Sequence, residues 1–91
     1  MKEYLIIDGY NIINAWPELD ALKEEDLDYA RRKLIDMISE HAALTGQKTT
    51  VIFDAYLVKG NIGSREMIGG IEVIYTKEGV TADMAIERMA A

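Results

Sequence analysis

The sequence predicts an α/β fold built on a mostly parallel β-sheet. Three segments, 4–7, 48–53 and 71–75, are short apolar runs rich in β-branched residues, as expected of strands. Segments with helical features follow the first and the third of these runs. The resulting order is strand, helices, strand, loop, strand, helix, which is typical of a layered fold with parallel strands.

Length and composition describe one small soluble domain. The chain has 91 residues, of which 49% are hydrophobic and 29% are charged, and it contains no cysteine. Disulfides, thiolate zinc sites and thiol catalysis are therefore excluded. The sequence begins without a signal-like apolar segment, and no apolar run approaches the length of a membrane span. We therefore expect a cytoplasmic protein that does not enter a membrane.

The net charge of −6 restricts how this chain could act on nucleic acid. A broad basic surface is not expected, because such surfaces neutralise phosphates with Lys and Arg. An acidic chain that acts on nucleic acid needs divalent cations, a local basic loop, or a partner that presents the substrate.

The first strand, 4–7, is expected to be buried on both faces and runs directly into Asp8. Since an ionised Asp is costly to bury, Asp8 should lie at the edge of the sheet. Gly9 then allows a sharp turn that leaves the carboxylate unobstructed. Asn11 could fold its amide back toward that carboxylate or toward a phosphate oxygen. Alternatively, Asp8 and Gly9 form only a turn, with Asp8 bonded to nearby amides.

Two helices are expected between the first and second strands. Pro17 suits a first helical turn and predicts a short helix over 17–23. A longer helix is predicted over 25–45, and Gly46 is a suitable C-cap. Its apolar residues recur at three- and four-residue steps, at Leu27, Ala30, Leu34, Ile38 and Ala42. The basic run at 31–33 has acidic neighbours, which indicates a solvated helix face.

The second strand, 48–53, also ends at a carboxylate, Asp54. The following segment, 56–70, has no clear period and is predicted to be a long loop, which in a small domain is usually functional or mobile. Lys59 and Arg65 are its cations. They are either ordinary surface charges or contacts for a polyanion.

The third strand, 71–75, is followed by a predicted turn at 76–79. Thr81 is a plausible N-cap for a helix that starts at residue 82. Asp83 lies in the first turn of that helix, where the helix dipole favours an acidic residue even without any function.

The three aspartates nevertheless suggest a common site. Parallel strands present their carboxyl ends at the same edge of a sheet, so Asp8, Asp54 and Asp83 should converge there. Three anions brought together repel one another unless cations lie between them, and oxygen-only ligands suit Mg²⁺ or Mn²⁺. Metal-assisted phosphodiester hydrolysis is the chemistry that these residues best support.

Three motifs in this order resemble the YacP-like NYN domain, a branch of the PIN-like nuclease superfamily. They are Ile-Ile-Asp-Gly-Tyr-Asn-Ile-Ile-Asn at 6–14, Val-Ile-Phe-Asp-Ala at 51–55, and Gly-Gly-Ile-Glu-Val-Ile-Tyr-Thr-Lys-Glu-Gly-Val-Thr-Ala-Asp at 69–83. The resemblance runs over all 91 residues. It implies a Rossmann-like, three-layer α/β/α fold and a metal-dependent endoribonuclease.

The resemblance also implies specific roles. Asp8, Asp54 and Asp83 would be the acidic catalytic residues and metal ligands, and Asn11 would orient Asp8 or the substrate. The substrate would be RNA, specifically messenger RNA on a bacterial ribosome. Delivery by the ribosome would suit a chain that is itself acidic.

Family domains continue beyond the length of this chain and carry a further site aspartate. The resemblance therefore implies that residues 1–91 are the N-terminal part of a single NYN domain. It also implies that this part need not have nuclease activity by itself. The alternative function is a non-catalytic ribosome- or protein-binding module of the same fold. A phosphatase or receiver-like domain, phosphorylated on Asp8 or Asp54, is a third reading that lacks a suitably placed lysine.

An incomplete domain of this kind would leave an apolar sheet edge uncovered, so we predict that the chain self-associates. Size-exclusion chromatography over a range of protein concentrations measures this directly. A clean monomer at high concentration would contradict it.

Overall fold

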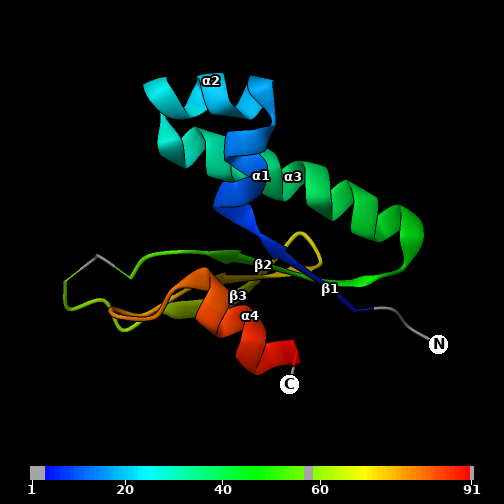
Figure 1. Cartoon of the computed structure of the whole chain (residues 1–91). Coiled ribbons are helices and arrows are strands. Elements are labelled where there is room, and N and C mark those ends of the chain that lie inside the picture. Colours follow the sequence, from blue (N-terminus) through cyan, green and yellow to red (C-terminus); the bar gives the residue numbers. More distant parts are fainter. Residues whose placement is uncertain (1–3, 57–58, 91) are drawn as a thin grey trace.

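Residues 4–56 and 59–90 are described by a computed structural model (Figure 1). Its elements, in chain order, are β1 (Tyr4–Asp8), α1 (Gly9–Ala15), α2 (Pro17–Glu25), α3 (Leu27–Thr45), β2 (Lys48–Phe53), β3 (Ser64–Ile68), β4 (Ile71–Tyr75) and α4 (Ala82–Ala90). The strands form one sheet in the order β1-β2-β4-β3. β1, β2 and β4 are parallel and β3 is antiparallel to β4, which confirms the predicted, mostly parallel sheet.

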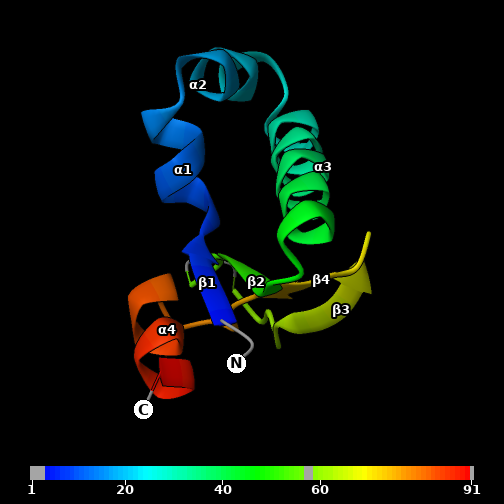
Figure 2. The ribbon, with the colours of Figure 1, turned by 90° about the vertical axis from the view of Figure 1, so that its right-hand side faces the viewer.

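The helices lie on both faces of the sheet and so make three layers. Figures 1 and 2 show α1, α2 and α3 on one side and α4 on the other. α3 contacts β2 and β4, whereas α4 contacts β1 and β2. The expected α/β/α layering is therefore present. Within the described ranges, no helix combines the length and the apolar character needed to cross a bilayer.

The main core lies between the sheet and the first three helices. Alternate residues of β2 and β4 point into it, because side chains in a strand alternate between its two faces. The buried core residues are Ile13, Leu19, Ala30, Leu34, Ile35, Ile38, Val51, Phe53, Ile71 and Val73. Full burial of a large aliphatic or aromatic side chain contributes roughly 1.5–3 kcal/mol, so this layer supplies much of the stability.

The long helix α3 has clear signals at both ends. Asp26 has an extended backbone and its Oδ1 accepts a hydrogen bond from the Tyr29 N–H at 3.1 Å, which starts the helix two residues later than predicted. Gly46 follows with φ 72°, and this confirms its role as a left-handed C-cap. Leu27 departs from the predicted buried stripe, since it is 40% exposed.

β1 is less buried than the sequence predicted. Its residues are partly or largely exposed, and Tyr4 is 46% exposed. The expectation of a strand buried on both faces is wrong because β1 is an outer strand: among the described residues it pairs only with β2.

The predicted loop at 56–70 contains a strand, β3, which the sequence reading missed. Gly69 and Gly70 both have positive φ and form the tight turn that joins β3 to β4. All five residues of β3 are exposed, so the strand has no apolar alternation by which it could have been recognised. Arg65 is thus a strand residue and not a loop residue.

A helix also replaces the predicted turn after Asp8, because α1 begins at Gly9. A Cβ atom at Gly9 would lie 2.5 Å from Cε1 and 2.7 Å from Cδ1 of Phe53. Gly9 is therefore required for close approach of α1 to the sheet, and not for a sharp turn of the backbone.

We expect Gly9→Ala to destabilise the fold by about 1–3 kcal/mol, because its methyl group would overlap the fully buried Phe53 ring. Urea unfolding measures this change. The same substitution in a Phe53→Leu background should cost less, because the overlapping ring is absent. Equal costs in the two backgrounds would show that the Phe53 contact is not the reason for Gly9.

Candidate active site

Asp8 ends β1 and caps the helix that follows. Its Oδ1 accepts a hydrogen bond from the backbone N–H of Asn11 at 3.3 Å. The contact predicted for the Asn11 side-chain amide is therefore made by the backbone instead, and that side chain is exposed. The capping role agrees with the plainer interpretation of Asp8, and it fixes the carboxylate at the carboxyl end of the strand.

Asp54 lies at the same edge of the sheet, directly after the neighbouring strand β2. Asp8 is paired with Ile52, and Asp54 follows two residues later, just beyond the end of β2. Its Oδ1 accepts the Tyr56 N–H at 3.1 Å and its Oδ2 accepts the Ala82 N–H at 3.3 Å. Asp54 therefore binds the N-terminus of α4 to the end of β2, a role that sequence reasoning missed.

α4 starts as predicted. The Thr81 Oγ1 accepts the Met84 N–H at 3.2 Å, which confirms Thr81 as its N-cap. Asp83 is exposed in the first turn, one residue after the N–H that Asp54 binds. The structure thus brings the start of α4, with Asp83, to the edge that carries Asp8 and Asp54.

A buried threonine, Thr76, joins the ends of two strands at this edge through hydrogen bonds. Thr76 is 4% exposed; its N–H donates to the Phe53 carbonyl at 3.1 Å and its Oγ1 accepts the Ala55 N–H at 2.8 Å. These two bonds join the ends of β2 and β4 on either side of Asp54. Sequence reasoning missed Thr76, because a single threonine after a strand carries no specific signal.

The donor set is compatible with a hard divalent cation but is not a complete cage. In residues 4–56 and 59–90, no three His, Cys, Asp or Glu side chains are close enough together to hold a metal ion. Mg²⁺, however, is commonly bound by one or two carboxylates together with water and substrate phosphates. Asp8 and Asp54 supply such carboxylates, and carboxylate oxygens are among the ligands that Mg²⁺ prefers.

The two predicted polyanion contacts lie in different places. Lys59 is exposed in the segment that follows Asp54. Arg65 is on β3, the strand farthest from β1, and its Nε pairs with Glu72 Oε2 at 3.2 Å. The structure therefore does not bring Arg65 to Asp8.

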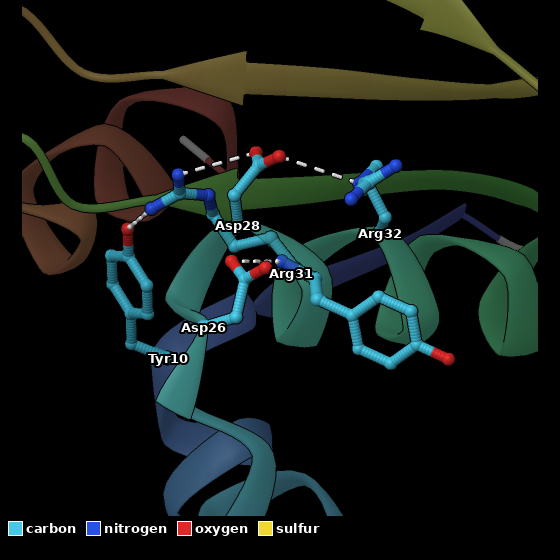
Figure 3. Close-up of polar contacts among 6 residues, drawn as sticks. Tyr10, Asp26, Asp28, Arg31 and Arg32 are labelled. Atoms are coloured by element: carbon cyan, nitrogen blue, oxygen red, sulfur yellow. Dashed lines mark hydrogen bonds and ion pairs between the residues drawn. The ribbon is translucent and has the colours of Figure 1, made fainter. Parts of the chain in front are cut away.

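Another cation lies closer to the site than the sequence indicated. Arg31 was assigned to a solvated helix face, but its side chain is only 21% exposed. Its Nη1 donates to the Tyr10 hydroxyl at 3.0 Å, and its guanidinium carbon lies 5.9 Å from the centre of the Tyr75 ring (Figure 3). Burial lowers the pKa of Arg31, but the hydrogen bond to Tyr10, the nearby phenols and the hydrogen bond to Asp28 raise it, and the net shift is upward.

Comparison with known proteins identifies the family of this chain. The model of the YacP-like NYN domain matches residues 5–91. The chain belongs to the YacP-like NYN family. YacP of Bacillus subtilis (strain 168) is 44% identical to this NYN chain over 88 residues, which cover 97% of the chain and 51% of YacP.

Solved structures show the same fold. The crystal structure of Rae1 (YacP) from Bacillus subtilis matches with a TM-score of 0.80 and 44% identity, covering 97% of this NYN chain and 50% of Rae1. The W164L mutant of Rae1 also matches with a TM-score of 0.80, at 40% identity, over 97% of this chain and 49% of the mutant chain. The NYN chain described here thus spans about half the length of these relatives.

The two strand-end aspartates should differ in their contribution to stability. We expect Asp8→Asn to change the free energy of unfolding by roughly 0.5 kcal/mol or less, because Asn is as good an N-cap as Asp. Asp54→Asn should cost about 1–3 kcal/mol, because its amide nitrogen would face one of the two backbone N–H groups that Asp54 now accepts. Urea unfolding of both variants tests this, and equal costs would refute the bridging role of Asp54.

Proposed function

We propose that this chain carries the acidic edge of a metal-dependent endoribonuclease. The observation that supports it most is the position of Asp8 and Asp54 at the carboxyl ends of neighbouring parallel strands, next to the start of α4. This is the edge at which open α/β sheets bind ligands. Membership of a nuclease-type family supports cleavage of a phosphodiester bond as the reaction class.

In this proposal, Asp8 and Asp54 hold Mg²⁺ or Mn²⁺, and Asp83 is the third candidate ligand. The ion, when bound, supplies positive charge to the phosphoryl group and a more acidic water. The protein's own contribution is orientation. Asp8 is held by the Asn11 N–H and Asp54 by two backbone N–H groups, so neither carboxylate must be ordered when the substrate arrives.

Asn11 lies in the first turn of α1, where its backbone N–H binds Asp8, and we assign its exposed side chain to orienting the substrate. Lys59, in the segment after Asp54, is the proposed contact for the RNA backbone. Arg65 is a weaker candidate because Glu72 already pairs with it. A net charge of −6 gives the chain little general attraction for RNA, which supports messenger RNA presented on the ribosome as the substrate.

The metal site can be tested by titrating the folded chain with Mn²⁺ and recording amide NMR spectra. Paramagnetic broadening should centre on residues near Asp8 and Asp54 and should weaken in Asp8→Asn. Asp36→Asn, an equivalent change on the exposed face of α3, is the control and should leave the broadening unchanged. In an RNA cleavage assay, Asp8→Asn should abolish cleavage while the fold is kept.

No broadening near Asp8, Asp54 or Asp83 in a folded sample would remove the metal site. Cleavage retained by Asp8→Asn would contradict the role given to that residue. If ribosome co-sedimentation survives Asp8→Asn and the wild type cleaves nothing, the non-catalytic binding module is the better description.

A further inference from the structure

The position of Arg31 connects it to the acidic edge. α3 and β2 run in opposite directions, so the first turns of α3 lie over the end of the sheet at which β2 stops (Figure 1). Arg31 is in the second turn of α3 and points to Tyr10, which follows Asp8 by two residues (Figure 3). The guanidinium is thereby bound to the segment of chain that presents one of the two strand-end carboxylates.

Aromatic packing fixes this guanidinium with respect to the strand ends. The Tyr10 ring meets Phe53 edge-on, with centroids 5.2 Å apart, and Phe53 stacks on Tyr75 at 5.3 Å. Phe53 directly precedes Asp54, and Tyr75 ends β4. Arg31 lies over Tyr75 and donates to Tyr10, so it contacts the first and last rings of this row. Its position relative to the acidic edge is therefore set by two rings that pack against the core residue Phe53.

The charge of Arg31 is only weakly compensated. Tyr10 supplies a hydroxyl oxygen and not a carboxylate, and burial raises the pKa of the Tyr75 phenol. Arg31 forms an ion pair with the carboxylate of Asp28 at 3.4 Å (Figure 3). The Asp28 side chain is 64% exposed and also pairs with Arg32 at 3.3 Å. Exposed ion pairs of this kind contribute little to the stability of a protein, because water screens the attraction between the two charges.

Arg31 also has unused hydrogen-bonding capacity. A guanidinium has five N–H donors, and the two contacts above use only part of them. Its Nε is buried and, within the described residues, has no hydrogen-bond partner. A purely structural arginine is normally better satisfied than this, because an unpaired buried donor is costly. Because Nε is buried, an incoming anion would meet the terminal nitrogens, Nη1 and Nη2, each of which has an N–H beyond the one given to Tyr10 or Asp28.

We propose that Arg31 binds a backbone phosphate of the RNA that lies against the acidic edge. This inference rests on the proposed function and adds a residue that holds the substrate. The planar guanidinium suits the oxygens of a phosphate, and its order before binding reduces the entropy lost on binding. Arg31 is thus a binding residue, whereas Asp8 and Asp54 serve the reaction itself.

The experiment measures binding of a fluorescent single-stranded RNA oligonucleotide by anisotropy at several KCl concentrations and constant Mg²⁺. Arg31→Met should weaken binding at low salt about tenfold or more, the loss expected for a charged hydrogen bond. The slope of log K against log salt should fall in magnitude by about 0.7, the value for one phosphate contact on a single strand.

Arg32→Met is the matched control. It removes the same charge from the adjacent residue, whose side chain is exposed and also pairs with Asp28. It should leave the salt slope of the wild type unchanged. Arg31→Lys should keep that slope but bind several-fold more weakly, since a lysine keeps the charge and loses the planar fork. The Lys variant also decides the question if Arg31→Met does not fold.

The outcomes separate this inference from the proposed function. Wild-type affinity and slope in Arg31→Met, or wild-type affinity in Arg31→Lys, would overturn the phosphate contact and leave the nuclease proposal intact. An equal loss of slope in Arg32→Met would assign the effect to general charge and would also overturn it. No RNA binding by the wild type at any salt concentration would count against the RNA substrate, and the role of Arg31 would fail with it.

Discussion

Parallel pairing of β1, β2 and β4 is the constraint on which the candidate site depends. In an antiparallel sheet, consecutive strands end at opposite edges, and Asp8 and Asp54 would be separated by the length of a strand. The observed register instead places Asp54 two residues beyond the partner of Asp8. The crossover helices that parallel pairing requires then become the three-helix layer, which covers the core face of the sheet.

The carboxyl edge is also a structural junction, and this affects any chemistry there. Asp54 accepts N–H groups from its own loop and from the start of α4, and Thr76 bonds both to β2 and to the residue after Asp54. A carboxylate oxygen has more than one lone pair, so Asp54 can keep these bonds and still contact a cation. The site and the docking of α4 are therefore physically coupled, because one side chain serves both.

Local patterns were enough to predict much of the fold. β2, β4 and the long helix α3 have strong signals in residue type and period, and Gly46 and Thr81 are caps whose chemistry depends only on near neighbours. β3 and α1 could not be predicted in this way. β3 is exposed along its whole length, so pairing with β4 determines it, and the start of α1 depends on space against Phe53, 44 positions away in the sequence.

The same distinction explains which part of the candidate site was visible in the sequence. Asp8 and Asp54 are recognisable because each follows an apolar strand directly, and topology brings such residues together. Arg31 has no local mark, since its helix neighbours include charges of both signs and its partners, Tyr10 and Tyr75, lie on other elements. Carboxylates that attract a cation also repel a phosphate, so an acidic edge that receives RNA needs a positive group held nearby without neutralising it. In the proposed function Arg31 is that group, because aromatic rings position its guanidinium and its carboxylate partner, Asp28, is an exposed residue.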